Sequence, residues 1–373
     1  MSERFTIQDI ARLAGVSKAT VSRVLNHKPD VKPETRERVL RLVDEHDFVP
    51  SLTASRLARG RPHSIGVLVP ALTWPFIPEI VQGVAERIEQ SSYELILYSA
   101  AHEKERNVLL ERILDTKLTS GLLAVTPGPF SQRLTHLYEE GFPMVVIDDQ
   151  RPPPNAPWVG VDNRMGAYGA VRYLLELGHK KIAHIKGPAT YQCSLDRYDG
   201  YQQALAEAGI APHPDYVVQG DFLVASGLTA AYSLFALPEP PSAIFAANDH
   251  MAWGVLEAAE ECGLRVPEDL SVVGFDDMVP SAHKQPPLTT VSQPFYEIGL
   301  RAAELLLWLV EVRGTAPGEG PGAGMPFSMP VRSPAPRELL RIQAETSLVV
   351  RQSCSAYQIA PTSGHRPSLA SAR

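Results

Sequence analysis

The sequence predicts an α/β protein in which a small helix-turn-helix head precedes a body of doubly wound parallel sheets. Two observations carry this prediction. Between residues 6 and 43 apolar side chains recur at helical spacing, whereas from Ser64 onward short apolar runs alternate with longer amphipathic stretches. Such an alternation is typical of βαβ units, which build parallel sheets. A chain of 373 residues is long enough for both a small head and a large body.

Residues 6–26 give two helix signals around a tight turn. Thr6 is a good N-cap, Asp9 three residues later completes a weak capping box, and Gly15 ends the first helix. Ser17 caps a second helix. The apolar residues of that second helix fall on one face, at Val21, Val24 and Leu25.

The opposite face of the second helix carries small, hydrogen-bonding or cationic side chains: Lys18, Ala19, Ser22, Arg23 and Asn26. These residue types suit a close approach to base edges in a DNA groove, where Arg23 can donate a bidentate pair to a guanine. Groups expected to hold phosphates or helix ends are Thr6, Ser17, Thr20, Ser22 and Asn26. An ordinary amphipathic helix pair would share the apolar spacing but not the helix-turn-helix layout.

The pattern continues toward the body. Pro33 takes a first helical position, and Val39 and Val43 face inward from a third helix. A segment with a leucine at residue 57 follows, and then an apolar strand at residues 65–69. The order of these elements resembles the lactose-repressor/galactose-repressor (LacI/GalR) family of bacterial transcription regulators, and the resemblance covers residues 5–354.

Charge is distributed unevenly along the chain. The whole protein has a formal net charge of -7, which by itself disfavours binding to nucleic acid. Residues 1–63, however, hold twelve lysines and arginines against eight acidic residues, and no acidic residue occurs between Phe48 and His63. Contact with phosphates requires such a locally basic segment.

Residues 51–63 are predicted to form a hinge helix and linker after a DNA-binding head at residues 1–50. The helical part is too short to be stable alone in water. The resemblance implies that it folds when two subunits meet on DNA, with Leu57 wedged into a central base step and Ala54 packed beside it. An ordinary linker leucine is the alternative. Ser51 replaces the Asn that the family usually has after the proline.

The body, residues 64–354, alternates strands and helices. The expected strands are 65–69, 93–98, 121–125, 143–147, 181–185, 243–246, 270–275 and 347–351, and the expected long helices are 78–89, 164–177, 249–262 and 294–313. The resemblance implies two lobes, as in periplasmic sugar-binding proteins, with crossovers near Asp162, near Thr290 and after the last helix. Lobe 1 then comprises residues 64–162 and 291–325, and lobe 2 residues 163–290 and 337–354. Ligands of such sheets bind at the carboxyl ends of strands, here in the cleft between lobes.

Side chains at strand ends match the family's effector positions: Phe76, Asp148, Arg197, Phe222, Asn248, Asp249 and Asp276. Arg197 can make paired hydrogen bonds to vicinal hydroxyls or a carboxylate, and Phe222 can stack on a sugar ring or a purine. Structural alternatives stay open, because Asn248 and Asp249 could cap the helix that they open. Phe222 could equally belong to the core, and Trp74 could reach the ligand or only the surface.

Two segments lack regular patterns. Residues 314–336 contain five glycines and six prolines, which predicts an extended loop at or beside the third crossover, where family members have a short connection. The tail, residues 355–373, is polar, lacks apolar periodicity and is predicted to be disordered. It also lacks leucine heptads, so a homodimer is the expected assembly.

Cysteines and apolar runs bear on location and cofactors. Cys193, Cys262 and Cys354 are widely spaced, which favours neither a disulfide framework nor a metal site. The sequence shows no signal peptide and no apolar run long enough for a membrane. We therefore expect a cytoplasmic, nucleoid-associated protein without cofactor or metal.

The resemblance implies a transcriptional regulator, in most members a repressor, that binds a pseudo-palindromic operator in double-stranded DNA as a homodimer. A small-molecule effector would control it, and the Arg, Asp and Asn set suits a sugar better than a purine. A corepressed regulator that responds to a purine or another metabolite is the alternative. A transport-type binding protein would need a signal peptide in place of the basic head. An enzyme is disfavoured because no P-loop, nucleophile elbow or dinucleotide fingerprint occurs.

Overall fold

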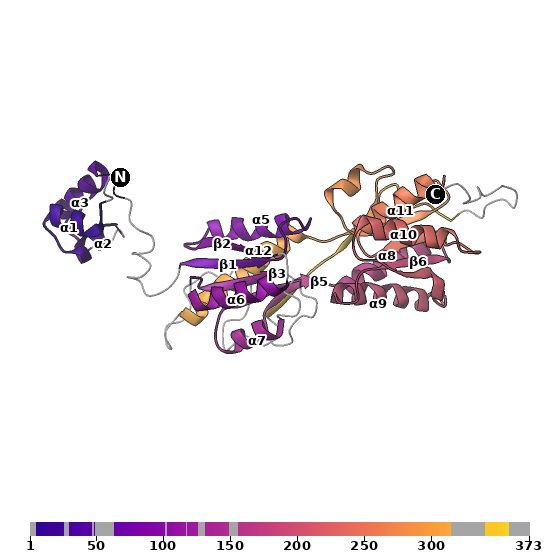
Figure 1. Cartoon of the computed structure of the whole chain (residues 1–373), viewed down its shortest axis with the longest axis horizontal. Coiled ribbons are helices and arrows are strands. Elements are labelled where there is room, and N and C mark those ends of the chain that lie inside the picture. The colour runs from indigo at the N-terminus through magenta and orange to yellow at the C-terminus, as the bar shows by residue number, and fades with distance from the viewer. Residues whose placement is uncertain are drawn as a thin grey trace. The chain divides into compact units, whose positions relative to one another are not determined.

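The computed structural model describes residues 5–25, 30–46, 48, 63–100, 103–116, 118–125, 131–148, 156–314 and 340–357. The chain divides into two compact units, Met1–His63 and Ser64–Arg373. Most of their helices and some of their strands are labelled in Figure 1. Among the described residues, no helix is long and apolar enough to cross a membrane.

The described residues of the first unit form three helices, α1 (Ile7–Ala14), α2 (Lys18–Leu25) and α3 (Pro33–Glu45). Thr6 and Asp9 form a full capping box at the start of α1, and Gly15 ends that helix with a φ of 63°, which a glycine adopts at little cost. The buried residues of the unit come from all three helices and the segment after them: Ile10, Ala11, Ala14, Val21, Val24, Val39 and Phe48. The predicted helix-turn-helix arrangement is confirmed.

The first lobe of the body is a six-stranded parallel sheet with the strand order β11-β5-β4-β3-β1-β2. Its strands are β1 (Ser64–Val69), β2 (Glu94–Ser99), β3 (Gly121–Val125), β4 (Met144–Ile147), β5 (Trp158–Val161) and β11 (Arg341–Ala344). One face packs against α5 (Ile77–Glu89) and α12 (Phe295–Gly314), and the other against α6 (Glu103–Thr116) and α7 (Ser131–Glu139). Because side chains alternate along a strand, Val67 faces the first helix pair and Leu68 the second.

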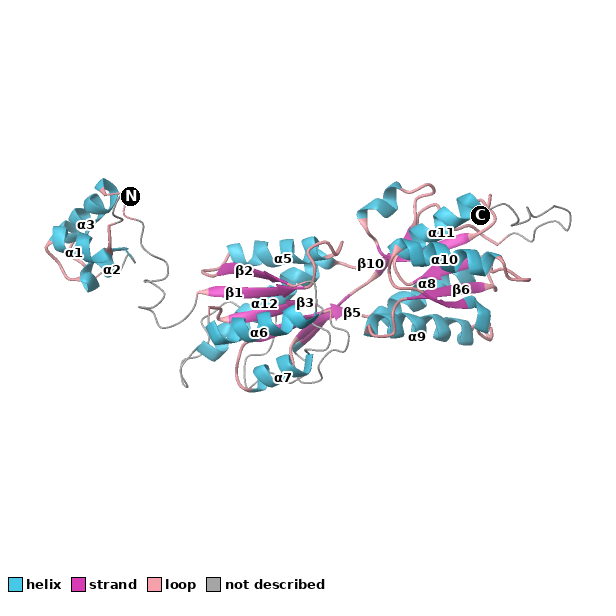
Figure 2. Ribbon diagram, in the orientation of Figure 1, coloured by secondary structure: helices cyan, strands magenta, loops and turns pink. Residues whose placement is uncertain are grey.

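The second lobe repeats this plan with the strand order β12-β10-β9-β8-β6-β7. Its strands are β6 (Ile182–Lys186), β7 (Val217–Gln219), β8 (Ala243–Ala246), β9 (Ser271–Asp276), β10 (Thr289–Ser292) and β12 (Ser347–Val349), of which only β12 runs antiparallel to its described neighbour. Helices α10 (Val224–Phe235) and α11 (Asp249–Glu261) cover one face, and α8 (Asn163–Glu176) and α9 (Gln192–Glu207) the other. Short 3-10 helices occur at Pro214–Tyr216 and Val279–His283. Figure 2 shows the helices of each lobe on both sides of its strands.

The chain passes between the lobes three times. It crosses at Asp162 between β5 and α8, between β10 and α12, and again between β11 and β12. The expectation that residues 337–354 belong wholly to lobe 2 is wrong, because residues 341–344 pair in parallel with β5 of the first sheet. Residues 314–336 therefore connect two elements of the first lobe and do not lie at the third crossover.

The start of the predicted disordered tail is also ordered against the second lobe. The Ser355 amide donates to Ser271 Oγ at 3.1 Å, and the Tyr357 amide donates to the Leu177 carbonyl at 2.8 Å. The tail prediction is therefore wrong for residues 355–357, since they bind the Ser271 hydroxyl at the start of β9 and the Leu177 carbonyl at the end of α8. Residues 358–373, like most of the predicted hinge and of the Gly/Pro-rich segment, lie outside the described residues.

Candidate functional site

The predicted DNA-facing side of α2 is exposed, while its other side forms the core of the head. Val21 and Val24 have no exposed surface. Lys18, Ala19 and Arg23 are exposed, as the prediction requires, and Thr20 and Ser22 are half-buried. The spacing of these residues on one short helix places three candidate base contacts on the same solvent-facing surface.

Arg23 makes an ion pair with Asp30, with Nη1 3.2 Å from Oδ2. The two side chains are 61% and 51% exposed, so water competes for both partners. Exposed pairs of this kind contribute about 0–1 kcal/mol, which a contact with a guanine would easily replace. No pattern in the sequence indicated Asp30 as a partner of Arg23.

Thr6 and Ser17 both serve helix ends. The Thr6 hydroxyl donates to Asp9 Oδ2 at 2.7 Å, and Ser17 Oγ accepts from the Thr20 amide at 3.1 Å. The Ser17 and Thr20 hydroxyls lie 2.9 Å apart. Contacts of these residues with phosphates stay predictions. Three further predicted DNA contacts lie outside the described residues: Asn26, Ala54 and Leu57.

A second cluster surrounds Arg197, which lies on α9 and is only 4% exposed. Its Nε donates to Asn163 Oδ1 at 2.9 Å and its Nη1 to the Ala247 carbonyl at 2.6 Å. Its Nη2 is 3.5 Å from Asp276 Oδ1, and its guanidinium carbon is 3.7 Å from the centre of the Phe275 ring. Arg197 is therefore held at the carboxyl edge of the second sheet, where β8 and β9 end.

Among the carboxylates that interact with this guanidinium, two lie at the carboxyl ends of strands, Asp148 and Asp276. Asp276 ends β9 with a φ of 108° and accepts a hydrogen bond from Gln293 Nε2 at 2.7 Å. Burial raises the pKa of Asp276 to about 6, and the charge of Arg197 opposes that rise. Burial also raises the pKa of Asp148, which follows β4 of the first lobe with a φ of 45°, and Arg197 again opposes the rise. Left-handed backbone at two non-glycine residues is a strained feature typical of binding sites.

Aromatic rings form a continuous series of contacts from the first lobe to the second. Phe76 stacks on Phe295 with centroids 5.3 Å apart and meets the edge of Trp74 at 5.8 Å. Trp74 meets the edge of Tyr191 at 6.5 Å, and Tyr191 meets that of Phe222 at 5.7 Å. Trp74, Phe76 and Phe222 are half-buried, so each retains some accessible ring surface. Rings of this kind provide flat apolar surfaces for a sugar or a base.

Phe222 is held in place by its backbone and by its neighbours. It has a φ of 72°, and its carbonyl accepts a hydrogen bond from Asn248 Nδ2 at 3.0 Å. Its ring lies over Gly187, where any Cβ would overlap it. Asn248 also caps α11, because its Oδ1 accepts from the Met251 amide at 3.0 Å. The capping alternative for Asn248 is thus confirmed, and Asn248 positions Phe222 as well, while its contact with an effector stays a prediction.

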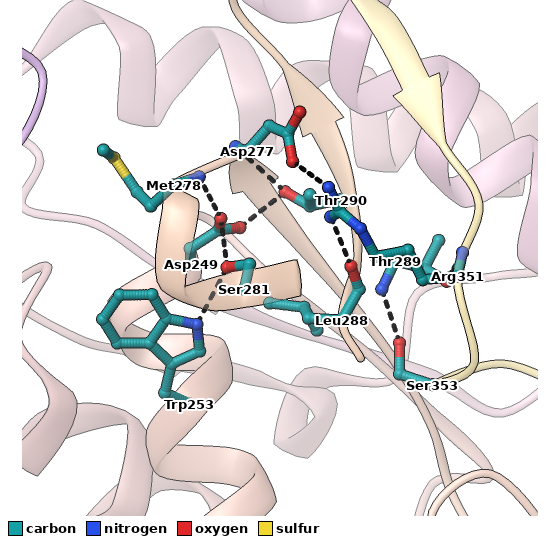
Figure 3. A network of polar contacts seen from close by, with 10 residues as sticks. All are labelled: Asp249, Trp253, Asp277, Met278, Ser281, Leu288, Thr289, Thr290, Arg351 and Ser353. Carbon is teal, nitrogen blue, oxygen red and sulfur yellow. Dashed lines mark hydrogen bonds and ion pairs between the residues drawn. The ribbon is translucent and has the colours of Figure 1, made fainter. Parts of the chain in front are cut away.

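Asp249 lies inside the lobe, at the centre of the polar network in Figure 3. Its carboxylate accepts three hydrogen bonds, from the Met278 amide (2.7 Å), the Ser281 hydroxyl (2.6 Å) and the Thr290 hydroxyl (2.5 Å). Burial raises the pKa of Asp249 to about 7, and the charge of Asp276 adds to the rise. The side chain has no exposed surface. The structure gives Asp249 this internal role in place of the predicted contact with an effector.

Sequence reasoning missed three residues of this cluster. Asn163 accepts from Arg197 and directly follows the crossover at Asp162. Gln293 donates to Asp276 and directly follows β10, which leads into the second crossover. Their proximity to the predicted crossovers was the available signal. Tyr191, at the N-cap of α9, links Trp74 to Phe222, and no pattern in the sequence singled it out.

Comparisons with known proteins agree with both parts of this description. Residues 6–51 match the family model of bacterial regulatory proteins, lacI family, and residues 171–323 match a periplasmic binding protein-like domain. The chain is 37% identical over 316 residues to the HTH-type transcriptional repressor CytR of Escherichia coli (strain K12), a match that covers 84% of this chain and 92% of that protein.

Solved structures show the same architecture. The Lac repressor dimer bound to operator and the anti-inducer ONPF is similar with a TM-score of 0.79 and 27% identity, over 95% of this chain and 100% of that one. The complex of the transcriptional regulator CelR with cellobiose is similar with a TM-score of 0.66 and 31% identity, over 94% of this chain and 100% of that one.

Proposed function

The chain belongs to the LacI family of bacterial regulatory proteins, a family of DNA-binding transcriptional regulators, and we propose that it represses transcription from a pseudo-palindromic operator as a homodimer. A small sugar bound between the lobes of the body controls its affinity for DNA. The relatives are regulators, and we infer that this chain likewise has no catalytic role.

In the proposed complex the two heads of a dimer enter successive major grooves. Each α2 presents Lys18, Ala19 and Arg23 to base edges, and Arg23 exchanges its ion pair with Asp30 for a bidentate contact with a guanine. Ser17, Thr20 and Ser22 hold the adjacent phosphates. Leu57 of each subunit wedges into the central base step, where the cost of unstacking is offset by the further contacts that a bent duplex allows.

One observation carries the proposal of a sugar. Half-buried aromatic rings of both lobes form a series that ends at Phe222, whose carbonyl is bound by Asn248. The preceding residue, Ala247, accepts a hydrogen bond from Arg197, which pairs with Asp276. A pyranose ring can stack on Phe76 or Phe222, while its hydroxyls donate to Asp276 and accept from Arg197. The CelR structure, which holds cellobiose, is consistent with such a ligand.

A purine is the second candidate, because the same rings could stack on a base. A purine presents fewer hydroxyl groups to the two carboxylates, so the polar side chains favour the sugar. A purine effector would also point to corepression in place of release by an inducer.

The test is a thermal-shift screen of the full-length protein against mono- and disaccharides, nucleosides and purine bases. A ligand that binds the folded state raises the melting temperature by mass action. We expect a sugar to raise it, and we expect Phe222→Leu to reduce that effect while Tyr357→Leu, an exposed aromatic on the same lobe, does not. A purine as the sole hit would replace the sugar proposal.

A further inference from the structure

We infer from the groups around Arg197 that the effector is an uncharged, hydroxyl-rich molecule and that the site rejects phosphate esters. This inference rests on the proposed effector site and narrows the class of ligand that the site accepts.

Arg197 has little capacity left for an anionic ligand. Three of its nitrogens already face protein acceptors, at Asn163, Ala247 and Asp276. One face of the guanidinium is covered by the Phe275 ring at 3.7 Å, so a ligand cannot approach from that side. An arginine that binds phosphate presents both Nη groups as a free fork, whereas here each Nη already faces a protein acceptor, which leaves one N–H on each for a ligand hydroxyl.

Negative charge exceeds positive charge around the same point. Asp148, Asp196 and Asp276 all interact electrostatically with Arg197. Lys186, at the end of β6, lies with its Nζ 5.0 Å from the centre of the Tyr198 ring. A phosphate monoester carries close to two negative charges at pH 7 and would meet three carboxylates here. Like charges at a partly desolvated site oppose binding strongly.

Two buried polar atoms show which hydrogen bonds the ligand should supply. Gln293 is 6% exposed, and its amide nitrogen donates to Asp276, while its Oε1 has no partner among the described residues. Ser194 is 2% exposed, and its hydroxyl also has no partner there. Its Oγ lies beside Gly187, as the Phe222 ring does. A buried acceptor without a donor costs free energy, and a ligand hydroxyl would remove that cost.

Carboxylate oxygens and the Gln293 carbonyl only accept hydrogen bonds, so the ligand has to donate them. A sugar or nucleoside hydroxyl is a donor, whereas a phosphate dianion is not. The geometry and the charges therefore select against phosphorylated forms of the same sugar.

The experiment compares each uncharged ligand with its own phosphate ester on the full-length protein at pH 7.5. Suitable pairs are glucose with glucose 6-phosphate, trehalose with trehalose 6-phosphate, and adenosine with AMP. We expect one parent compound to raise the melting temperature and its ester to bind at least about tenfold more weakly. An ester that raises the melting temperature as much as its parent would overturn the inference.

A second measurement does not depend on finding the effector. Inorganic phosphate is added at constant ionic strength to the wild type and to the D148N/D276N variant. We expect a larger phosphate-induced rise in melting temperature for the variant, because two repelling charges are gone. Equal rises in the two proteins would contradict the charge argument. If an uncharged ligand binds but leaves operator affinity unchanged, the proposed regulation fails while the inference on ligand charge stands.

Discussion

Arg351 and Asp277 form an ion pair, with Nη2 2.7 Å from Oδ1, that joins the segment after the last strand to the turn that follows Asp276. Arg351 also donates from Nη1 to the Leu288 carbonyl at 2.8 Å and from its amide to Thr289 Oγ1 at 2.9 Å. Arg351 therefore connects the turn after β9, beside the proposed effector site, to β10 and to the end of β12. The second crossover follows β10, and the third precedes β12.

We predict that R351M lowers the free energy of unfolding by about 1–3 kcal/mol, because it leaves the largely buried Asp277 carboxylate and the Leu288 carbonyl without their donors. R265M is the matched control, since Arg265 pairs with Asp269 while its side chain is 70% exposed, and it should cost at most about 1 kcal/mol. Urea denaturation of the three proteins measures both values. Equal losses in the two variants would show that the position of Arg351 has no special role.

The raised pKa of Asp249 predicts how the free energy of unfolding depends on pH. Its folded-state pKa of about 7 lies above the value of an unfolded chain, so the folded protein holds this proton more tightly. The resulting contribution to stability is present at low pH and is lost as the pH rises through 7. An amide at this position cannot ionise. With its oxygen in place of Oδ2 it keeps the hydrogen bonds from Met278 and Ser281, and its nitrogen can donate to the Thr290 hydroxyl once that hydroxyl rotates.

The stability of the wild type relative to D249N should therefore fall between about pH 5 and about pH 8, by on the order of 1–3 kcal/mol. Denaturant unfolding of both proteins at each pH measures this difference. A difference that does not change with pH would mean that Asp249 keeps an ordinary pKa.

The two roles of Asn248 can be separated by substitution. N248D keeps an acceptor for the Met251 amide but loses the donor to the Phe222 carbonyl, whereas N248A loses both. We expect N248D to retain most of the stability and to weaken effector binding, and N248A to lose about 1 kcal/mol of stability as well. Titration calorimetry with the ligand from the screen measures effector binding, and thermal unfolding measures stability. Unchanged ligand affinity in N248D would show that the Asn248–Phe222 contact does not position the ring.

A substitution at Arg23 tests whether the head recognises bases directly. R23A should weaken binding to the operator by about 1–3 kcal/mol and leave binding to random duplexes largely intact. R12A removes an exposed arginine of α1 that pairs with Asp9 and should not change the preference for the operator. Fluorescence anisotropy with an operator selected from a random library gives both affinities. An equal loss on operator and random DNA in R23A would limit Arg23 to a phosphate contact.

The sequence predicted most strands closely where apolar runs are fully buried. Gly121–Val125 and Ala243–Ala246 have the expected bounds, because every side chain in them is buried and the runs are uninterrupted. Four strands were missed: Trp158–Val161, Val217–Gln219, Thr289–Ser292 and Arg341–Ala344. The third is rich in hydroxyl side chains, and the fourth alternates exposed and half-buried residues. Missing the latter also misplaced the third crossover.

Candidate site residues could be proposed where a residue type carries the chemistry by itself, as with Arg197, Asp276 and Phe222. The structure brings Arg197 and Asp276 together, and contacts of all three with an effector stay predictions. The interior role of Asp249 could not be predicted, because its three donors lie 29, 32 and 41 residues away along the chain. Only the tertiary fold brings these groups together. The same holds for the contact between Trp74 and Tyr191, which belong to different lobes.

The central claim is that a ligand bound beside Arg197 changes the affinity of the head for operator DNA. The most direct measurement is the operator dissociation constant with and without the ligand that gives the largest thermal shift, for the wild type and for R197A. The account predicts a change of about 5–150-fold in the wild type, as is typical of coupled sites, and none in R197A with its operator affinity retained. A wild-type dissociation constant that stays the same at saturating ligand would contradict the account.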